Sequence, residues 1–176
     1  MNEAQLKALL LADEDIYQIL RIIKPIEFFG FRAYFAEEDY KTAAMAFEPS
    51  TVAFFSMPVI MKLMKSNFNI SLFFIRYLAK QLGYSDDRTV NLTQKHIRGR
   101  LAESLIFLRD SYGIEEDGYT LSIYLSREDL ANLSNMTTSN AIRTLSAFAN
   151  EKLIAIDGRK IKLINSDEIL RISQMG

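Results

Sequence analysis

The apolar positions of the chain recur at helical spacing in some stretches and follow a strand-like pattern in others. Residues 3–12 place apolar side chains among good helix formers and stop at the acidic run that begins at Asp13, which predicts a short surface helix. Residues 57–66 predict a second helix, with Pro58 in its first turn, where the missing N–H costs nothing. Residues 16–55 are short apolar runs broken by proline and glycine and rich in aromatic and β-branched residues, so we expect compact β structure there.

The longest helical pattern covers residues 69–94 and is interrupted only by Gly83. Its apolar residues form two faces, one with Ile70, Phe74, Tyr77, Leu78 and Tyr84 and the other with Phe73, Ile75, Ala79 and Leu82. A helix that is apolar on two sides packs on its own domain and on something else, and a second copy of the chain is the economical partner. Complete burial within one domain is the alternative.

The C-terminal part of the chain shows the order helix, loop, strand, helix, turn, helix, hairpin. A helix is predicted over residues 96–111, ending before Gly113, and an acidic loop at 115–117 then separates two working parts. Residues 119–125 alternate like a strand. The segment that follows, roughly residues 126–163, has the organisation of a winged helix-turn-helix.

Polar residues mark the ends of the two helices in this segment. Ser126 is a good N-cap and is followed three residues later by Asp129, as in a relative of the capping box. Asn135 stands where the chain must turn sharply, a place that favours residues tolerating a left-handed backbone. Thr137 can cap the second helix, and the small Ala131 suits a tight helix crossing.

The second helix would present a polar face to a DNA major groove. Ala141, Leu145 and Phe148 point inward by their spacing, which leaves Thr138, Ser139, Ile142 and Arg143 on the open side. Arg143 can bond bidentately to guanine, and Thr138 and Ser139 can reach bases or phosphates. The hairpin signal Asp157-Gly158 follows, with Arg159 and Lys160 at its tip, and residues 152–163 hold four basic residues and one acidic one. We therefore assign DNA contact to Arg127, Thr137, Thr138, Ser139, Arg143, Arg159 and Lys160.

Residues 91–165 resemble the DNA-binding half of the cyclic AMP receptor protein/Fnr family of bacterial transcription regulators. The resemblance rests on the runs NLTQKHIRGRLAESLIFL, LSREDLANL, TTSNAIRTLSAF and LIAIDGRKIKL. Upstream, FFGFRAYFAEEDYKTAAMAFEPSTVAFF at residues 28–55 is similar to the phosphate-binding cassette of that family's cyclic-nucleotide-type β-roll. The resemblance implies a homodimer held by the helix at residues 70–94, double-stranded DNA as partner, and RNA polymerase as a further partner.

The resemblance also indicates where an effector would bind, at Gly30, Phe31, Lys41 and Thr42. Nucleotide-binding members have a glutamate for the ribose and an arginine for the cyclic phosphate, where this chain has Phe31 and Lys41. A phenylalanine accepts no hydroxyl hydrogen bond and lysine lacks the bidentate fork, so we expect no cyclic AMP binding and leave the small-molecule effector unknown. The sequence before Gly30 is short for a complete β-roll, which indicates a reduced sensor domain or a chain that begins late in its gene. Ser134 and Thr144 replace residues that are more often larger and apolar in the family.

Composition narrows the chemistry further. The 176 residues carry a formal net charge of −1, which argues against a protein that binds polyanions only by neutralising phosphates. The absence of cysteine excludes thiolate metal sites and cysteine nucleophiles. His96, the only histidine, has no ligand or catalytic partner pattern around it and is expected to be structural. We find no enzyme signature, metal site or cofactor motif, and no apolar run long enough for a membrane span, so a cytoplasmic protein is expected.

These observations predict an α+β fold with three parts. Residues 1–68 would form a shortened cyclic-nucleotide-binding-like β-roll region, residues 69–94 a dimerisation helix, and residues 95–176 a winged helix-turn-helix DNA-binding domain. The predicted function is a transcription regulator that binds a near-palindromic site as a homodimer. The alternative is a ligand-sensing or protein-interaction module whose winged helix no longer binds DNA. Activation and repression are both left open.

Overall fold

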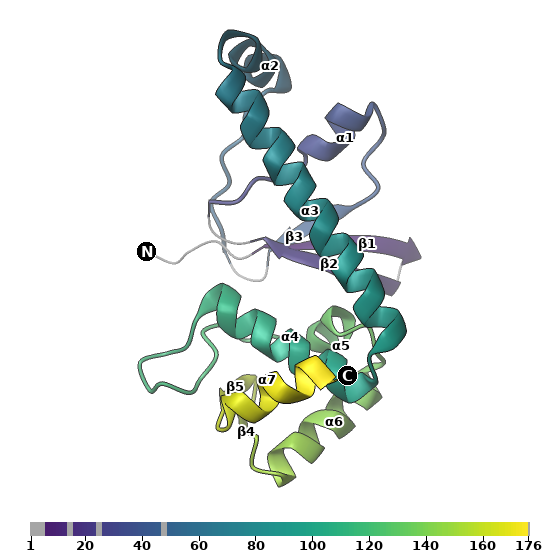
Figure 1. Cartoon of the computed structure of the whole chain (residues 1–176), viewed down its shortest axis with the longest axis vertical. Helices are drawn as coiled ribbons and strands as arrows, with labels where there is room; N and C mark the ends of the chain where they lie inside the picture. The colour runs from purple at the N-terminus through teal and green to yellow at the C-terminus, as the bar shows by residue number, and fades with distance from the viewer. Residues whose placement is uncertain (1–5, 14–15, 24–25, 47–48, 176) are drawn as a thin grey trace.

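The computed structural model describes residues 6–13, 16–23, 26–46 and 49–175, and it has the predicted α+β architecture. A three-stranded antiparallel sheet, of order β2-β1-β3, lies beside the long helix α3, and the helices of the C-terminal part pack below it (Figure 1). The elements in chain order are β1 (Leu6–Asp13), β2 (Ile16–Ile23), α1 (Phe31–Ala36), β3 (Ala43–Ala46), α2 (Met57–Ser66), α3 (Phe68–Gln94), α4 (Ile97–Tyr112), α5 (Arg127–Leu133), α6 (Thr138–Asn150), β4 (Ile154–Asp157), β5 (Lys160–Leu163) and α7 (Ser166–Met175).

The helix predicted over residues 3–12 is wrong for its described part, because residues 6–13 form the central strand of the sheet. Leu6 pairs with Ile23 of β2 on one side and with Ala46 of β3 on the other. Pairing along both edges satisfies the backbone of β1 and outweighs the helix propensity of its leucine-rich and alanine-rich sequence. Residues 3–5 of that prediction lie outside the described residues.

The β structure expected over residues 16–55 is confirmed for β2 and β3 and wrong for Phe31–Ala36, which form the short helix α1. This helix begins after Gly30, whose φ of 84° lies in the left-handed region that glycine adopts without a steric penalty. The buried side chains of Phe31 and Ala33 hold α1 to the rest of the molecule. Burial of the Phe31 side chain against the rest of the molecule therefore favours a helix over a strand at residues 31–36.

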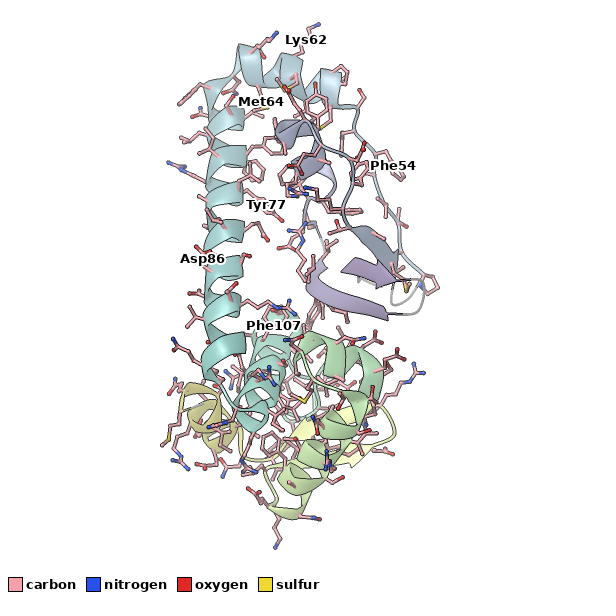
Figure 2. All side chains as sticks on the ribbon, turned by 90° about the vertical axis from the view of Figure 1, so that its right-hand side faces the viewer. Phe54, Lys62, Met64, Tyr77, Asp86 and Phe107 are labelled. Carbon is pink, nitrogen blue, oxygen red and sulfur yellow. The ribbon has the colours of Figure 1, made fainter. Side chains whose placement is uncertain are left out.

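The two helices predicted at residues 57–66 and 69–94 are confirmed as α2 and α3. Pro58 lies in the first turn of α2, and the Asn67 side chain accepts a hydrogen bond of 3.0 Å from Asn69 N at the start of α3. Figure 2 shows α3 along one side of the N-terminal part, with Tyr77 pointing toward α1.

One face of α3 packs on an aromatic cluster and an adjacent face is exposed. Phe74 is 7% exposed and contacts Phe31 with ring centroids 5.3 Å apart, whereas Ile75 is 57% and Leu82 64% exposed. Tyr84, grouped with Phe74 by its spacing, is 67% exposed. The ring contacts on α3 involve Phe73, Phe74 and Tyr77 only among the described residues, which places Tyr84 beyond the cluster.

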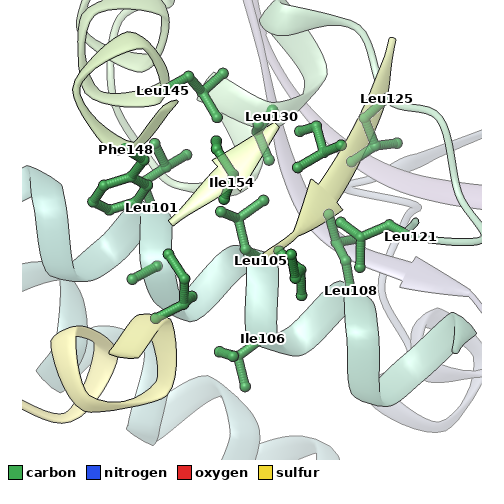
Figure 3. Packing of buried hydrophobic residues seen from close by; sticks show 14 of the residues in the cluster. Leu101, Leu105, Ile106, Leu108, Leu121, Leu125, Leu130, Leu145, Phe148 and Ile154 are labelled. Atoms are coloured by element: carbon green, nitrogen blue, oxygen red, sulfur yellow. The ribbon is translucent and has the colours of Figure 1, made fainter. Parts of the chain in front are cut away.

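The core lies between α4, α6 and the β4–β5 hairpin (Figure 3). Leucine side chains of α4 at 101, 105 and 108 pack in one cluster with Leu145 and Phe148 of α6, and all five are 1% exposed or less. Burying one such side chain stabilises the fold by about 1.5 to 3 kcal/mol. Ile19 and Ile22 of β2 belong to the same cluster, so the sheet and the C-terminal helices share a core.

The strand expected at residues 119–125 is present only as two isolated bridges, Thr120 with Lys162 and Leu121 with Ile114. Leu121, Ile123 and Leu125 are buried and alternate with more exposed residues. The alternation therefore arises because one side of this extended segment is buried. The segment is not a regular strand, because it lacks continuous backbone pairing with a neighbour. Within the described residues, no helix is both long and apolar enough to cross a membrane.

Candidate nucleic-acid interface

Side-chain caps begin both helices of the helix-turn-helix, as predicted. Ser126 Oγ accepts a hydrogen bond of 3.0 Å from Asp129 N and donates one of 2.8 Å to Asp129 Oδ2. Thr137 Oγ1 accepts a hydrogen bond of 3.3 Å from Asn140 N at the start of α6. These bonds satisfy backbone N–H groups that have no partner inside the helix.

The turn between α5 and α6 depends on a left-handed residue and on a buried hydroxyl pair. Asn135 has φ 49°, and Met136 N donates to Ala131 O at 3.0 Å, which closes the turn. Ser134 is 2% exposed, and its Oγ donates to Ser104 Oγ of α4 at 2.8 Å. The hydroxyl that replaces a larger apolar residue at this position is therefore paired across the helix interface.

Helix α6 has the two faces predicted from its spacing. Ala141, Leu145 and Phe148 are 1% exposed or less, whereas Thr138, Ser139, Ile142 and Arg143 are exposed. The Arg98 guanidinium lies 4.7 Å from the Phe148 ring centroid and forms an ion pair with Glu151. This contact fixes the C-terminal end of α6 against α4 and leaves the outer face open.

Arg143 has a partner on α6 that sequence reasoning missed. Its Nη2 donates a hydrogen bond of 2.6 Å to Asn140 Oδ1, three residues earlier and therefore on the same face of the helix. Thr144 Oγ1 donates to Asn140 O at 2.9 Å, so the second residue that departs from the family pattern is also bonded. The i, i+3 spacing of asparagine and arginine was the available signal for the Arg143 contact.

The hairpin is present, with its turn one residue later than expected. Asp157 pairs with Lys160, so the two-residue turn is Gly158-Arg159 instead of Asp157-Gly158. Gly158 takes φ 56°, as the tight turn requires. Arg159 therefore lies at the tip itself, and its side chain is exposed.

Arg127, the first residue of α5, contacts the turn of the hairpin. Its Nη2 donates a hydrogen bond of 2.7 Å to Gly158 O, and its Nη1 is buried without a hydrogen-bond partner. The side chain predicted to contact DNA therefore ties the first helix to the turn of the wing. Such a bond holds the hairpin tip at a fixed place relative to the helix-turn-helix.

Two lysines of the hairpin face acidic side chains in the loop before α5. Lys160 Nζ lies 3.7 Å from Glu115 Oε2 and 5.1 Å from the Tyr124 ring centroid. Lys162 Nζ lies 3.1 Å from Asp117 Oδ2. Both pairs are partly exposed to solvent, where such attractions are weak. The acidic loop predicted as a separator therefore lies against the wing and offsets part of its positive charge.

Two of the four predicted effector positions, Phe31 and Lys41, have side chains that contact other residues. Phe31 is 8% exposed and its ring contacts Phe74 and Tyr77, so its side chain is used in packing. Lys41 and Thr42 are exposed, and Lys41 Nζ lies 2.7 Å from Glu38 Oε2. This lysine holds the pKa of the Glu38 carboxyl below its usual value. The cation at the phosphate-binding position is thus already paired with a carboxylate.

His96 is the N-cap residue of α4, and its backbone oxygen accepts a hydrogen bond of 3.0 Å from Arg100 N. Within the part of the chain that the structure describes, no group of three or more histidine, aspartate or glutamate side chains could hold a metal ion.

The sequence of the chain is similar to those of known proteins. The family model of the Crp-like helix-turn-helix domain matches residues 99–172. The anaerobic regulatory protein of Bacillus subtilis is 25% identical over 154 residues, which are 86% of this chain and 65% of that protein. The CRP-like cAMP-activated global transcriptional regulator of Mycobacterium tuberculosis is 24% identical over 98 residues, which are 55% of this chain and 44% of that protein. The chain thus spans about half to two thirds of the length of these relatives.

The fold of the whole chain is similar to solved structures as well. FixK2 from Bradyrhizobium japonicum superposes with a TM-score of 0.85 at 18% sequence identity, covering 97% of this chain and 83% of FixK2. The family match covers α4 to α7, the elements that build the caps, the outer face of α6 and the wing described above. Residues 99–172 therefore form a Crp-like helix-turn-helix domain, and the sequence relatives and the fold support a regulator of the Crp/Fnr type.

Proposed function

We propose that this regulator binds a near-palindromic DNA site as a homodimer, with α6 in the major groove and the β4–β5 turn against the phosphate backbone. The observation that carries the proposal is the exposed outer face of α6, where Thr138, Ser139 and Arg143 lie together on a helix held by its buried opposite face. Arginine bonds guanine bidentately, and hydroxyls near a helix N-terminus bind phosphates or bases. Arg159 at the exposed turn would contact phosphates.

The homodimer part of the proposal rests on the exposed apolar face of α3. Ile75, Leu82 and Val90 are 57%, 64% and 48% exposed on this helix. Two copies of α3 packed along this face would present two recognition helices, as a two-fold symmetric site requires. The proposed division of labour is a sensor-like part at residues 1–68, a dimerisation helix at 69–94 and a DNA-binding part at 95–176, with RNA polymerase and a small effector as further partners.

We also propose that cyclic AMP does not control this protein. Phe31 is packed in the aromatic cluster, and Lys41 is paired with Glu38, so neither side chain is available in the way that a ribose or a cyclic phosphate requires. Titration calorimetry with cyclic AMP should show no heat of binding at micromolar concentrations. A micromolar dissociation constant would contradict this part of the proposal.

The experiment that tests DNA binding is selection of bound fragments from a random DNA pool, followed by shift assays over a range of salt concentrations. A DNA-binding dimer should enrich a symmetric sequence. Its affinity should fall steeply as the salt concentration rises, because binding releases counterions from the DNA phosphates and added salt opposes that release. Failure to enrich any sequence would favour the alternative, a sensing or interaction module without DNA binding. The observation that favours this alternative is that Lys160 and Lys162 form ion pairs with acidic side chains, which reduce the positive charge of the hairpin.

A further inference from the structure

The guanidinium of Arg88 lies where α3, β2 and α5 meet. Its Nη2 donates to Ile19 O at 2.7 Å and to Leu133 O at 3.4 Å, and its Nη1 donates to Leu20 O. All three acceptors are backbone carbonyls, two in the sheet of the N-terminal part and one in the last residue of α5, the first helix of the helix-turn-helix. One side chain of the long helix therefore joins the sheet to the DNA-binding part.

The acceptors of Arg88 lie where regular backbone hydrogen bonding is interrupted or ends. In the β1–β2 ladder Ala8 pairs with Arg21 and Leu9 with Ile19, so Leu20 is an extra residue at a bulge. β2 is an edge strand of the sheet, and Leu133 ends α5, where carbonyls have no intrahelical donor and carry partial negative charge. A cation that bonds all three satisfies them together.

Apolar packing surrounds this contact. Ile19 and Ile22 of β2 are 0% and 3% exposed and lie in one cluster with Leu105 of α4 and Leu130 of α5. Burial lowers the pKa of Arg88, because the charged form loses solvent, and the nearby carboxylate of Glu103 acts in the opposite direction. The sheet therefore packs on the C-terminal part through an apolar patch, with the Arg88 cation at the edge of that patch.

We propose that Arg88 is a positioning residue that holds the DNA-binding part against β2 and so sets the direction in which α6 faces. The role of this orientation in DNA binding rests on the function proposed above. The docked arrangement leaves the outer face of α6 exposed, and α6 lies at the end of the molecule away from the sheet (Figure 1). A displacement of β2 relative to α3 would then also move α5, because the Arg88 guanidinium bonds carbonyls of both β2 and α5.

The positioning role is tested without DNA, by measuring the distance between the two parts. The chain contains no cysteine, so cysteines placed at the exposed Lys80 of α3 and Asn150 of α6 can carry nitroxide labels in an otherwise native protein. Electron–electron resonance on samples diluted with unlabelled chain reports the distance within one protomer. The native protein and the matched control Arg76→Met, at an exposed arginine of the same helix, should give one narrow distribution.

Removing the guanidinium should broaden that distribution. Arg88→Met should give a wide range of distances while circular dichroism shows unchanged helix content. Arg88→Lys should fall between the native protein and Arg88→Met, since an ammonium is a point charge without the planar fork. Because Arg88→Lys keeps the charge, it decides the question even if Arg88→Met fails to fold. Native-like narrow distributions in the folded variants would overturn the positioning role.

DNA binding provides the second measurement. Arg88→Met should bind a fragment with two half-sites several-fold more weakly than the native protein, because two loosely held helices must be ordered on binding, and should bind a single half-site equally well. An unchanged or higher affinity for the two-half-site fragment would overturn the inference that the docked orientation is the one that binds DNA. If the native protein binds neither fragment, the proposed function fails while the distance measurement still decides the role of Arg88.

Discussion

Arg143 Nη2 donates a hydrogen bond of 2.6 Å to Asn140 Oδ1, and both residues lie on the side of α6 that faces away from the core. The bond uses one of the five N–H donors of the guanidinium and leaves the others free. The arginine is therefore held in one orientation before any ligand arrives. Because the side chain is already ordered, binding costs less side-chain conformational entropy.

The first prediction concerns base reading by Arg143. Arg143→Ala should weaken binding to the preferred site by about 1 to 3 kcal/mol and relax the base preference at one position in each half-site. Asn140→Ala should leave the same base preferred but bind it less tightly, since the arginine loses its support. Selection from a random pool and shift assays measure both effects.

A matched control for this prediction is Arg171→Ala on α7, where the arginine bonds Glu168 instead of facing outward on α6. This control should bind the selected site as the native protein does. If Arg143→Ala leaves both affinity and base preference unchanged, α6 is not the recognition helix.

The second prediction concerns the wing. Arg159→Ala should weaken binding to all DNA sequences alike and lower the salt slope of log affinity by about one unit, because one phosphate contact is lost. Lys160→Ala should have a smaller effect, since Lys160 Nζ already lies 3.7 Å from a Glu115 carboxylate oxygen. Affinities at a series of salt concentrations separate the two variants. A change of base preference in Arg159→Ala would show that the turn reads sequence.

The third prediction distinguishes the exposed face of α3 from its packed face. Leu82→Arg should give a folded monomer, because Leu82 is 64% exposed and would lie in the interface between two copies. Phe74→Arg should instead unfold the N-terminal part, because Phe74 is 7% exposed and packs on Phe31. Light scattering with circular dichroism checks both. A native protein that is monomeric at micromolar concentration would contradict the dimer.

The fourth prediction concerns stability at acid pH. Asp117 accepts hydrogen bonds from Thr120 Oγ1, Thr120 N and Tyr119 N and lies 3.1 Å from Lys162 Nζ. The bonds from Thr120, first of all the hydroxyl, hold the pKa of this carboxyl below its ordinary value of 3.8. The Asp117 carboxylate therefore stabilises the folded state fully when the pH is above its ordinary pKa. This stabilisation is lost progressively as the pH falls below that pKa.

Asp117→Asn should lower the free energy of unfolding at neutral pH and make its decline below about pH 4 shallower than in the native protein. Urea unfolding at several pH values measures this difference. Glu116→Gln, at an exposed residue of the same loop, is the control and should change neither. Parallel acid profiles for Asp117→Asn and the native protein would show that the carboxylate does not act in this way.

The C-terminal part was predictable from the sequence because its signals are local. Ser126, Asn135 and Thr137 act within a few residues of their own position, through caps and a left-handed turn. The spacing of Ala141, Leu145 and Phe148 defines the buried side of α6 and, by subtraction, its exposed side. A 3.6-residue period and short-range hydrogen bonds are properties that the sequence itself carries.

The N-terminal part depended on contacts between residues far apart in the sequence. The segment at residues 6–13 has the propensity of a helix, yet pairing with β2 and β3 makes it a strand, and burial of Phe31 on α3 makes α1 a helix. The contacts of Arg88 with Ile19 and Leu133 span 69 and 45 residues. No local pattern encodes such contacts, so only the tertiary structure decided which strand carries the bulge and which carbonyls the arginine meets.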